Sequence, residues 1–175
     1  MKKGYPLFLN LEGEPCLVFG GGKVAFRKIE ALLKRGAKVT CVSKEFCVPL
    51  KKMKLKRVRS SRISLNGARL VIAATSDREF NARVVRECRR QKIWVNVVDD
   101  PALCDFTVPA VMEKGPLQIA ISTSGTSPLF AKRLREALEE VIPSSTGQLL
   151  EKIGAIRLKM VGAPLRGRPS NRAGT

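Results

Sequence analysis

One stretch near the start of the chain, residues 15–36, constrains the fold more than any other. It begins with the apolar run of residues 16–19, continues with three glycines, and ends with apolar residues at helical spacing. A strand, a glycine turn and a helix in this order open a dinucleotide-binding fold, and Gly20, Gly22 and Ala25 fill its G-x-G-x-x-A fingerprint. Glycine turns also join strands to helices where no ligand binds, but this position between a strand and a helix favours a nucleotide.

Four further strands are predicted after this unit, and a helix capped by Ser76-Asp77 precedes the last of them. The strands cover residues 38–42, 55–58, 69–75 and 93–98, the helix covers residues 78–91, and residues 5–11 form a candidate edge strand before the glycine turn. This alternation predicts an α/β fold, a Rossmann-type doubly wound parallel sheet.

Ligands of such sheets bind outside the carboxyl ends of the strands. The predicted strand ends place the glycine turn, Thr75, Asp99 and the segment Ser43, Lys44 and Glu45 around one crevice. A protein selective for NAD commonly ends its second strand with an acidic residue. Glu45 lies beyond the end of the second strand, too far along the chain for that role, and the positive charge of Lys44 suits a 2′-phosphate. These residues therefore leave the choice between NAD and NADP open.

The predicted pattern of parallel strands and helices ends near residue 106. Residues 106–112 and 117–123 are predicted strands of a hairpin, which cannot continue a parallel winding. Residues 122–127 form a hydroxyl-rich loop that either caps the following helix, residues 129–141, or binds an anion at its N-terminus. A further amphipathic helix is predicted over residues 147–160, and the Pro-, Gly- and Arg-rich residues 162–175 are predicted to be frayed.

Composition limits the possible partners and compartments. The 175 residues are 44% hydrophobic, but no apolar run reaches the ~20 residues of a membrane span and no secretory signal is evident, so a cytoplasmic location is expected. The formal net charge of +18 favours an anionic partner: a nucleic acid, a polycarboxylate, or no specific partner if the bias is only superficial. The basic residues between positions 49 and 62 are expected to form a solvated face.

The chain has five cysteines, no C-x-x-C pair and no histidine. This composition disfavours a zinc site and predicts reduced thiols, several of them in the core. Without histidine, any proton transfer must use Asp, Glu, Lys, Tyr, Cys or water.

Four segments in order resemble one known family. They are Y-P-L-F-L-N-L, V-F-G-G-G-K-V-A-F-R-K, V-N-V-V-D-D-P followed by C-D-F-T-V-P-A, and A-I-S-T-S-G-T-S-P. Together they are similar to the N-terminal module of siroheme synthase and to the stand-alone precorrin-2 dehydrogenases. The resemblance covers residues 5–143 and implies NAD-dependent oxidation of precorrin-2, a polycarboxylate tetrapyrrole, to sirohydrochlorin. A bifunctional enzyme that also inserts ferrous iron is the alternative.

The resemblance also implies an architecture. It predicts an NAD-binding Rossmann domain over residues 1–105, a strand-hairpin and helix dimerisation region over residues 106–143, and a C-terminal helix with a disordered basic tail over residues 144–175. The family forms a homodimer through its middle region, so residues 106–123 are expected to pair across subunits.

Individual residues carry over from the family's motifs. The essential aspartate of the family matches Asp99, directly after N-V-V. Among the predicted cofactor-binding residues, the family's motifs match Gly20, Gly21, Gly22, Lys23, Val24, Lys44 and Glu45. Ser43 and Thr75 are added because they lie at the predicted strand ends. The predicted substrate-binding residues, from the hydroxyl loop, are Ser122, Thr123, Ser124, Gly125 and Thr126. No resident metal site is predicted.

The chemistry fits this resemblance. A dehydrogenation needs a hydride acceptor and a group that takes one proton, and Asp99 is the best-placed base in a chain without histidine. Spacing alone also allows Asp99 to be an ordinary turn residue before Pro101. Two other classes remain as hypotheses: a nucleotide-sensing module without catalysis, and a nucleic-acid-binding protein.

Overall fold

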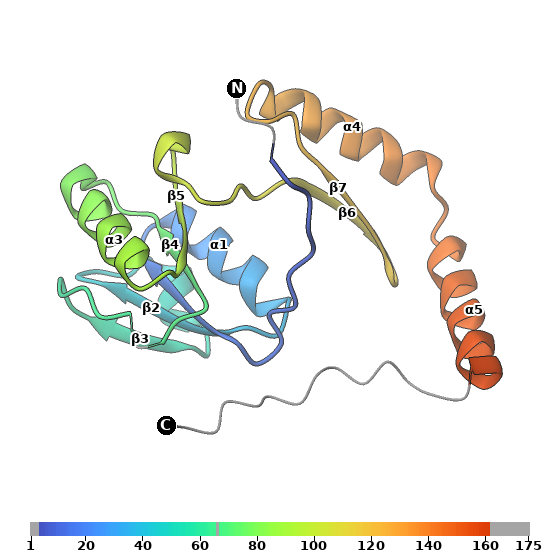
Figure 1. The fold of residues 1–175 in the computed structure, drawn as a ribbon, viewed down its shortest axis with the longest axis horizontal. Coiled ribbons are helices and arrows are strands. Elements are labelled where there is room, and N and C mark those ends of the chain that lie inside the picture. Colours follow the sequence, from blue (N-terminus) through green and yellow to red (C-terminus); the bar gives the residue numbers. More distant parts are fainter. Residues whose placement is uncertain (1–3, 66, 162–175) are drawn as a thin grey trace. The chain divides into compact units, whose positions relative to one another are not determined.

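The computed structural model describes residues 4–65 and 67–161, and the chain divides into two compact units, Met1–Val108 and Pro109–Thr175. The first unit contains a five-stranded sheet in the order β3-β2-β1-β4-β5 (Figure 1). Every neighbouring pair is parallel, as the sequence predicts. The strands are β1 (Pro15–Phe19), β2 (Lys38–Ser43), β3 (Lys56–Arg59), β4 (Leu70–Ala73) and β5 (Trp94–Val97).

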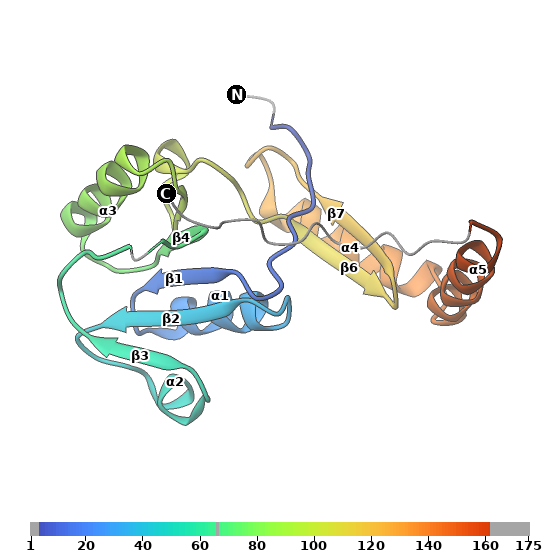
Figure 2. The same ribbon diagram turned by 60° about the horizontal axis from the view of Figure 1, so that its bottom comes forward.

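Helices α1 (Lys23–Leu33) and α3 (Arg78–Arg90) build the two halves of the core, and Figure 2 shows the sheet with α1 beside β1 and β2. Alternate residues of a strand point to opposite faces of a sheet. In β1, Cys16 and Val18 therefore pack in the cluster that contains α1, whereas Leu17 and Phe19 pack in the cluster that contains α3. The helices cover both faces, so the sheet is doubly wound and its central strands are buried.

Several local predictions for this unit were wrong. Residues 5–11 form no strand, and their apolar side chains include the exposed Tyr5 and Phe8. A short helix, α2 (Val48–Lys52), and a 3₁₀ turn, η1 (Pro101–Leu103), were not predicted. Each holds fewer than six residues, too few to show a helical period in the sequence. By contrast, the basic residues between positions 49 and 62 are exposed, as predicted, although they are divided between α2, the edge strand β3 and the segments beside them.

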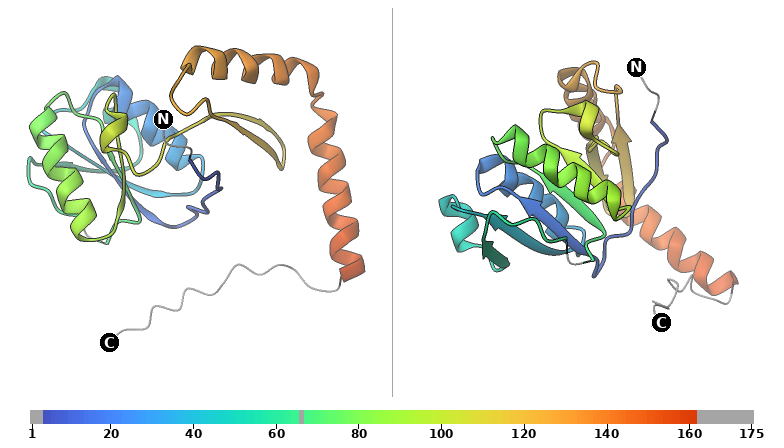
Figure 3. Two further views of the ribbon diagram at one scale, coloured as in Figure 1. Left: turned by 45° about the horizontal axis from the view of Figure 1, so that its top comes forward. Right: turned by 60° about the vertical axis from the view of Figure 1, so that its left-hand side comes forward.

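The second unit contains an antiparallel hairpin of β6 (Ala110–Lys114) and β7 (Leu117–Ile121), followed by α4 (Pro128–Val141) and α5 (Ser145–Val161) (Figure 3). The hairpin was predicted, but its first strand begins at Ala110 rather than at residue 106. That strand continues to Lys114, because the turn needs only Gly115, which has a φ of +56°, and Pro116.

Close backbone packing joins the hairpin turn to the start of α5. A Cβ atom added at Gly115 would lie 3.0 Å from the Cα atom of Gly147, and one added at Gly147 would lie 2.7 Å from the carbonyl oxygen of Lys114. The prediction for residues 162–175 lies outside the described residues. Among the helices of residues 4–65 and 67–161, none is long and apolar enough to span a bilayer.

Candidate dinucleotide site

The glycine turn between β1 and α1 has three glycines with three different surroundings. Gly20 has a φ of +125°, and a Cβ there would collide with the backbone of Ala74 after β4. A Cβ at Gly21 would collide with the carbonyl of Glu45, and the Gly21 carbonyl accepts a hydrogen bond of 2.7 Å from the Cys47 N–H. The first two glycines therefore let neighbouring loops pack against the turn.

Gly22 differs, because no atom of the described residues, apart from its chain neighbours, lies within 4 Å of the position that a Cβ would take. The backbone of Gly22 faces open space at the point where α1 begins. In the part of the chain that the structure describes, no side chain caps this helix, so the N–H groups of its first turn are free to bind an anion. Ala25 is fully buried, as expected of the small third residue of the fingerprint. The arrangement fits the pyrophosphate of a dinucleotide.

A cavity of about 650 Å³ lies over this turn at the carboxyl end of the sheet. Asp99, which follows β5, lines the same cavity as the three glycines. The complete lining comprises Gly20, Gly21, Gly22, Val24, Ser43, Glu45, Phe46, Cys47, Ala74, Thr75, Ser76, Val98 and Asp99. The structure thus brings a phosphate cradle and a carboxylate to one cavity within the first unit.

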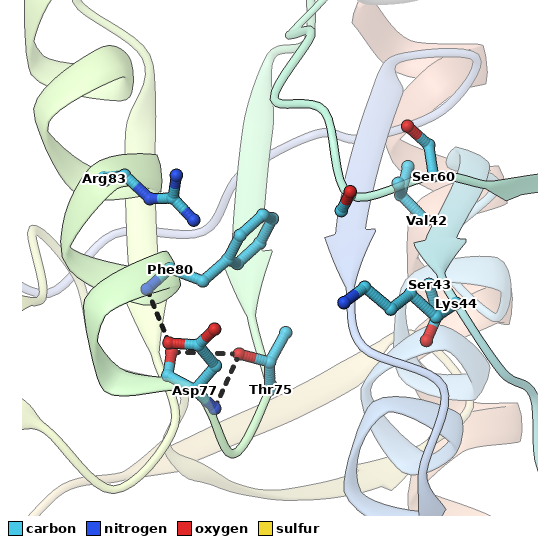
Figure 4. Close-up of a pocket in the computed structure, with 9 residues that line it drawn as sticks. Val42, Ser43, Lys44, Ser60, Thr75, Asp77, Phe80 and Arg83 are labelled. Atoms are coloured by element: carbon cyan, nitrogen blue, oxygen red, sulfur yellow. Dashed lines mark hydrogen bonds between the residues drawn. The ribbon is translucent and has the colours of Figure 1, made fainter.

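A second cavity of about 380 Å³ shares Ser43 and Thr75 with the first. Figure 4 shows Lys44 of the β2 end and Arg83 of α3 pointing into it from opposite sides, with the Phe80 ring between them. The complete lining comprises Val42, Ser43, Lys44, Ser60, Ser61, Thr75, Asp77, Phe80 and Arg83.

The backbone of Asp99 adopts a left-handed conformation with φ +63°, which is uncommon outside glycine. The Cys104 thiol ties the two sides of this bend together. Its sulfur accepts hydrogen bonds from the Val97 N–H at 3.1 Å and from Asn96 Nδ2 at 3.4 Å. The carbonyl oxygens of Val97 and Asp100 lie 3.2 Å and 3.3 Å from the sulfur, within reach of the S–H group. Burial raises the pKa of the Cys104 thiol, so it keeps the proton that it donates.

The chain after η1 also covers the open edge of β5. The Asp105 N–H donates to the carbonyl of Val95 at 2.9 Å, and the Asp105 carboxylate accepts from the Val95 N–H at 3.1 Å. The buried amide of Asn96 donates to the carbonyl of Phe106 at 2.9 Å. Because β5 is the last strand of the sheet, these bonds satisfy edge groups that the sheet leaves unpaired, and they fix the bend that carries Asp99.

Lys28 of α1 is electrostatically coupled to this bend. Burial lowers the pKa of Lys28 and the neighbouring Arg27 lowers it further, while Cys104 and Asp99 act in the opposite direction. The cavity that holds Asp99 therefore has a half-buried ammonium group in its surroundings.

A pair of hydrogen bonds between Thr75 and Asn81 holds the loop that joins β4 to α3. The Thr75 hydroxyl donates to Asn81 Oδ1 at 2.7 Å, and Asn81 Nδ2 donates to the Thr75 carbonyl at 3.0 Å. Asp77 accepts the Phe80 N–H at 2.9 Å and so caps α3, as the sequence predicts. These bonds position Thr75, the residue between the two cavities.

The hydroxyl loop belongs to the second unit, and its hydroxyls bond to its own backbone. The Ser122 hydroxyl accepts from the Ser124 N–H at 3.2 Å, and the Thr123 hydroxyl accepts from the Ser127 N–H at 3.0 Å. Ser127 caps α4 by accepting from the Phe130 N–H at 3.1 Å. Capping, one of the two predicted roles, is present. The loop holds Ser122, Thr123, Ser124, Gly125 and Thr126, and their role toward a substrate stays a prediction.

The predicted cofactor residues divide between the two cavities. Lys44 lines only the smaller one, and the exposed Lys23 at the start of α1 lines neither. The others line the larger cavity. Sequence reasoning missed the residues contributed by the β2–α2 loop, by the segment after β3 and by the inner face of α3, which are Phe46, Cys47, Ser60, Ser61, Phe80 and Arg83. Two other lining residues, Ser76 and Asp77, could be expected from the sequence, because they directly follow a predicted strand.

Two family models match the chain. Residues 7–110 match the model described as putative NAD(P)-binding, and residues 114–140 match the one described as sirohaem biosynthesis protein central. The first model covers more than half of the chain and agrees with the glycine turn and its cavity. The fold and the site thus define a Rossmann-type protein that binds a nicotinamide cofactor.

Comparison with known proteins identifies a narrower group of similar proteins within this class. The siroheme synthase of Methylobacillus flagellatus is 45% identical over 150 residues, which are 82% of this chain and 32% of that protein. The siroheme synthase of Methylococcus capsulatus is 44% identical over 158 residues, 87% of this chain and 33% of that protein. The solved structure of SirC, precorrin-2 dehydrogenase, superposes with a TM-score of 0.75 at 27% identity and covers 96% of this chain and 84% of that chain.

The chain spans about a third of the length of the curated relatives that it matches. It belongs to the family of siroheme synthase N-terminal modules and precorrin-2 dehydrogenases, as the four sequence segments predict. Its fold matches that of SirC.

Proposed function

We propose that the chain is an NAD-dependent dehydrogenase that oxidises precorrin-2 to sirohydrochlorin in siroheme synthesis. The observation that carries this proposal is the cavity of about 650 Å³ that Asp99 and the glycine turn line together. Family membership, the likeness to a protein named precorrin-2 dehydrogenase and the likeness to siroheme synthases supply the substrate.

The glycine turn would hold the cofactor. The open space in front of Gly22 admits a pyrophosphate to the backbone, and the free N–H groups at the start of α1 donate to its oxygens. Ser43 and Thr75 lie on the path from this turn to the smaller cavity. When bound, the nicotinamide ring supplies a hydride acceptor. We take NAD as the cofactor of the reaction.

Asp99 would take the proton. Removal of two electrons from the substrate as a hydride leaves one proton to be accepted, and a carboxylate in the cofactor cavity is suited to accept it. The bonds of Cys104 and Asn96 hold the bend of Asp99 in place, so the carboxylate is oriented before the substrate binds.

The charge of the chain suits this substrate. Precorrin-2 carries eight carboxylates, and a protein with a formal charge of +18 attracts such an anion at long range. The hydroxyl loop of residues 122–126 is the proposed contact in the second unit. A homodimer formed through that unit, and a cytoplasmic location, remain part of the proposal.

The test is anaerobic incubation of the purified chain with precorrin-2 and NAD. We expect one NADH for each sirohydrochlorin formed. Binding of NAD without turnover would favour a nucleotide-sensing module and refute the dehydrogenase. A second incubation, with sirohydrochlorin and ferrous iron, tests the bifunctional alternative, which requires metal insertion above the rate without protein. Size-exclusion chromatography with light scattering tests the homodimer.

A further inference from the structure

The smaller cavity has a charge pattern that bears on which dinucleotide fits. It adjoins the larger cavity through Ser43 and Thr75, at the end of β2 (Figure 4). In a doubly wound nucleotide-binding fold this is where the adenosine ribose lies, with its 2′ position beside the residues that follow the second strand. Here those residues are Ser43 and Lys44.

Among residues 4–65 and 67–161, no acidic side chain lies beside the end of β2, where it would select a free 2′-hydroxyl. Glu45 lines the larger cavity, where its backbone carbonyl packs against Gly21. The carboxylate that does line the smaller cavity, Asp77, accepts the Phe80 N–H at 2.9 Å and serves as the cap of α3. The wall beside the β2 end is therefore without the carboxylate that would repel a phosphate.

Two cations line the cavity instead. Lys44 enters from the end of β2, and Arg83 enters from α3 (Figure 4). The guanidinium carbon of Arg83 lies 5.5 Å from the centroid of the Phe80 ring, a cation–π contact that favours this placement of the guanidinium beside the cavity. Among the described residues, neither cation forms an ion pair, so both are available to an anionic ligand.

Hydroxyl groups complete the polar wall. Ser60 and Ser61 follow β3 and line the cavity together with Ser43. Hydroxyls donate to phosphate oxygens as readily as they accept from a ribose hydroxyl. A lysine ammonium, an arginine fork and several hydroxyls around one small cavity form the donor set of a phosphate site.

We propose that this cavity accepts the 2′-phosphate of NADP, so that the chain uses NADP alongside NAD. Lys44 and Arg83 are the specificity-determining residues. The inference rests on the proposed role of the two cavities as the cofactor site, and it adds that the adenosine end does not exclude the phosphorylated cofactor.

The experiment is isothermal titration calorimetry with adenosine 2′,5′-bisphosphate, adenosine 3′,5′-bisphosphate and 5′-AMP. The two bisphosphates carry the same charge, so the field of a +18 protein cannot distinguish them. We expect the 2′,5′ isomer to bind about tenfold more tightly than the 3′,5′ isomer, because a hydrogen bond to a charged group contributes that much.

Lys44→Ala and Arg83→Ala should each remove most of this preference, because each should weaken binding of the 2′,5′ isomer much more than binding of the 3′,5′ isomer or of 5′-AMP. Arg86→Ala is the matched control, since Arg86 is an exposed arginine one turn along α3 that does not line the cavity. Equal affinity of wild type for the two bisphosphates, or a preference that survives both variants, overturns the proposal.

Turnover separates this inference from the function on which it rests. Oxidation of precorrin-2 with NAD and with NADP supports both. Oxidation with NAD alone overturns the inference and leaves the dehydrogenase intact. No oxidation with either cofactor refutes the proposed reaction, while the calorimetric comparison still decides whether the cavity binds a 2′-phosphate.

Discussion

Substitution of Gly22 should separate cofactor binding from folding. Its φ of −87° and ψ of −175° are ordinary for any residue, and apart from its chain neighbours no described residue has an atom within 4 Å of an added Cβ. Alanine would gain ~0.4–1 kcal/mol through a less flexible unfolded chain and would lose a similar amount as a weaker N-cap than glycine. We therefore expect Gly22→Ala to change the free energy of unfolding by less than about 1 kcal/mol.

The same methyl group should weaken the binding of the cofactor. It would occupy the open space through which a pyrophosphate reaches the helix N–H groups, and loss of one hydrogen bond to a charged phosphate costs about 1.5–3 kcal/mol. The dissociation constant for NAD should rise by about tenfold to a hundredfold. Urea denaturation measures the stability, and calorimetric titration with NAD measures the affinity.

Gly20→Ala is the matched comparison. Its φ of +125° strains any side chain, by about 1–3 kcal/mol, and the added methyl also collides with the backbone of Ala74. This variant should therefore lose stability first. Wild-type affinity for NAD in a stable Gly22→Ala protein would refute the assignment of the glycine turn as the phosphate cradle.

Two further predictions concern the cysteines. Cys104→Ala removes the acceptor of the Val97 N–H, so it should cost about 1–3 kcal/mol of stability. It should also lower kcat more than it lowers the affinity for NAD, and Cys104→Ser should restore part of both the stability and kcat. An unchanged kcat in Cys104→Ala would contradict the role of Cys104 in positioning Asp99. Burial raises the pKa of Cys16 and Cys41 to about 11 and that of Cys88 to about 12, from the usual 9.0. The unfolded chain therefore loses these protons first, and stability, intact below pH 9, should fall toward pH 11 by up to about 1.4 kcal/mol per pH unit for each thiol. A urea midpoint equal at about pH 8 and about pH 10, in the presence of reductant, would contradict this prediction.

The features predicted from the sequence are those that short segments determine on their own. The glycine fingerprint with its buried Ala25 needs only the order strand, turn and helix. The cap that Asp77 provides for α3, and the cap that Ser127 provides for α4, follow from a side chain placed three residues before a free N–H. Parallel strands then bring Gly20 and Asp99 to one end of the sheet, because their carboxyl ends lie together.

The features that were missed depend on contacts between distant segments. Arg83 reaches the smaller cavity only because the α3 face that carries Phe80 packs beside the end of β2. The bonds from Cys104 to Val97 and Asp100 depend on the edge position of β5, and a lone cysteine gives no signal of them. Residues 5–11 have the composition of a strand, but they pair with none of the strands in the described part of the chain and remain irregular.

The most direct measurement compares Asp99→Asn with Asp100→Asn in anaerobic turnover of precorrin-2, with NAD affinity measured in parallel. Both changes replace a carboxylate by an amide in neighbouring residues of the same bend, and only Asp99 lines the cofactor cavity. We predict that Asp99→Asn lowers kcat by about a hundredfold or more at unchanged NAD affinity, while Asp100→Asn stays near wild type. Wild-type turnover by Asp99→Asn, or equal losses in both variants, would contradict the role of Asp99 as the base.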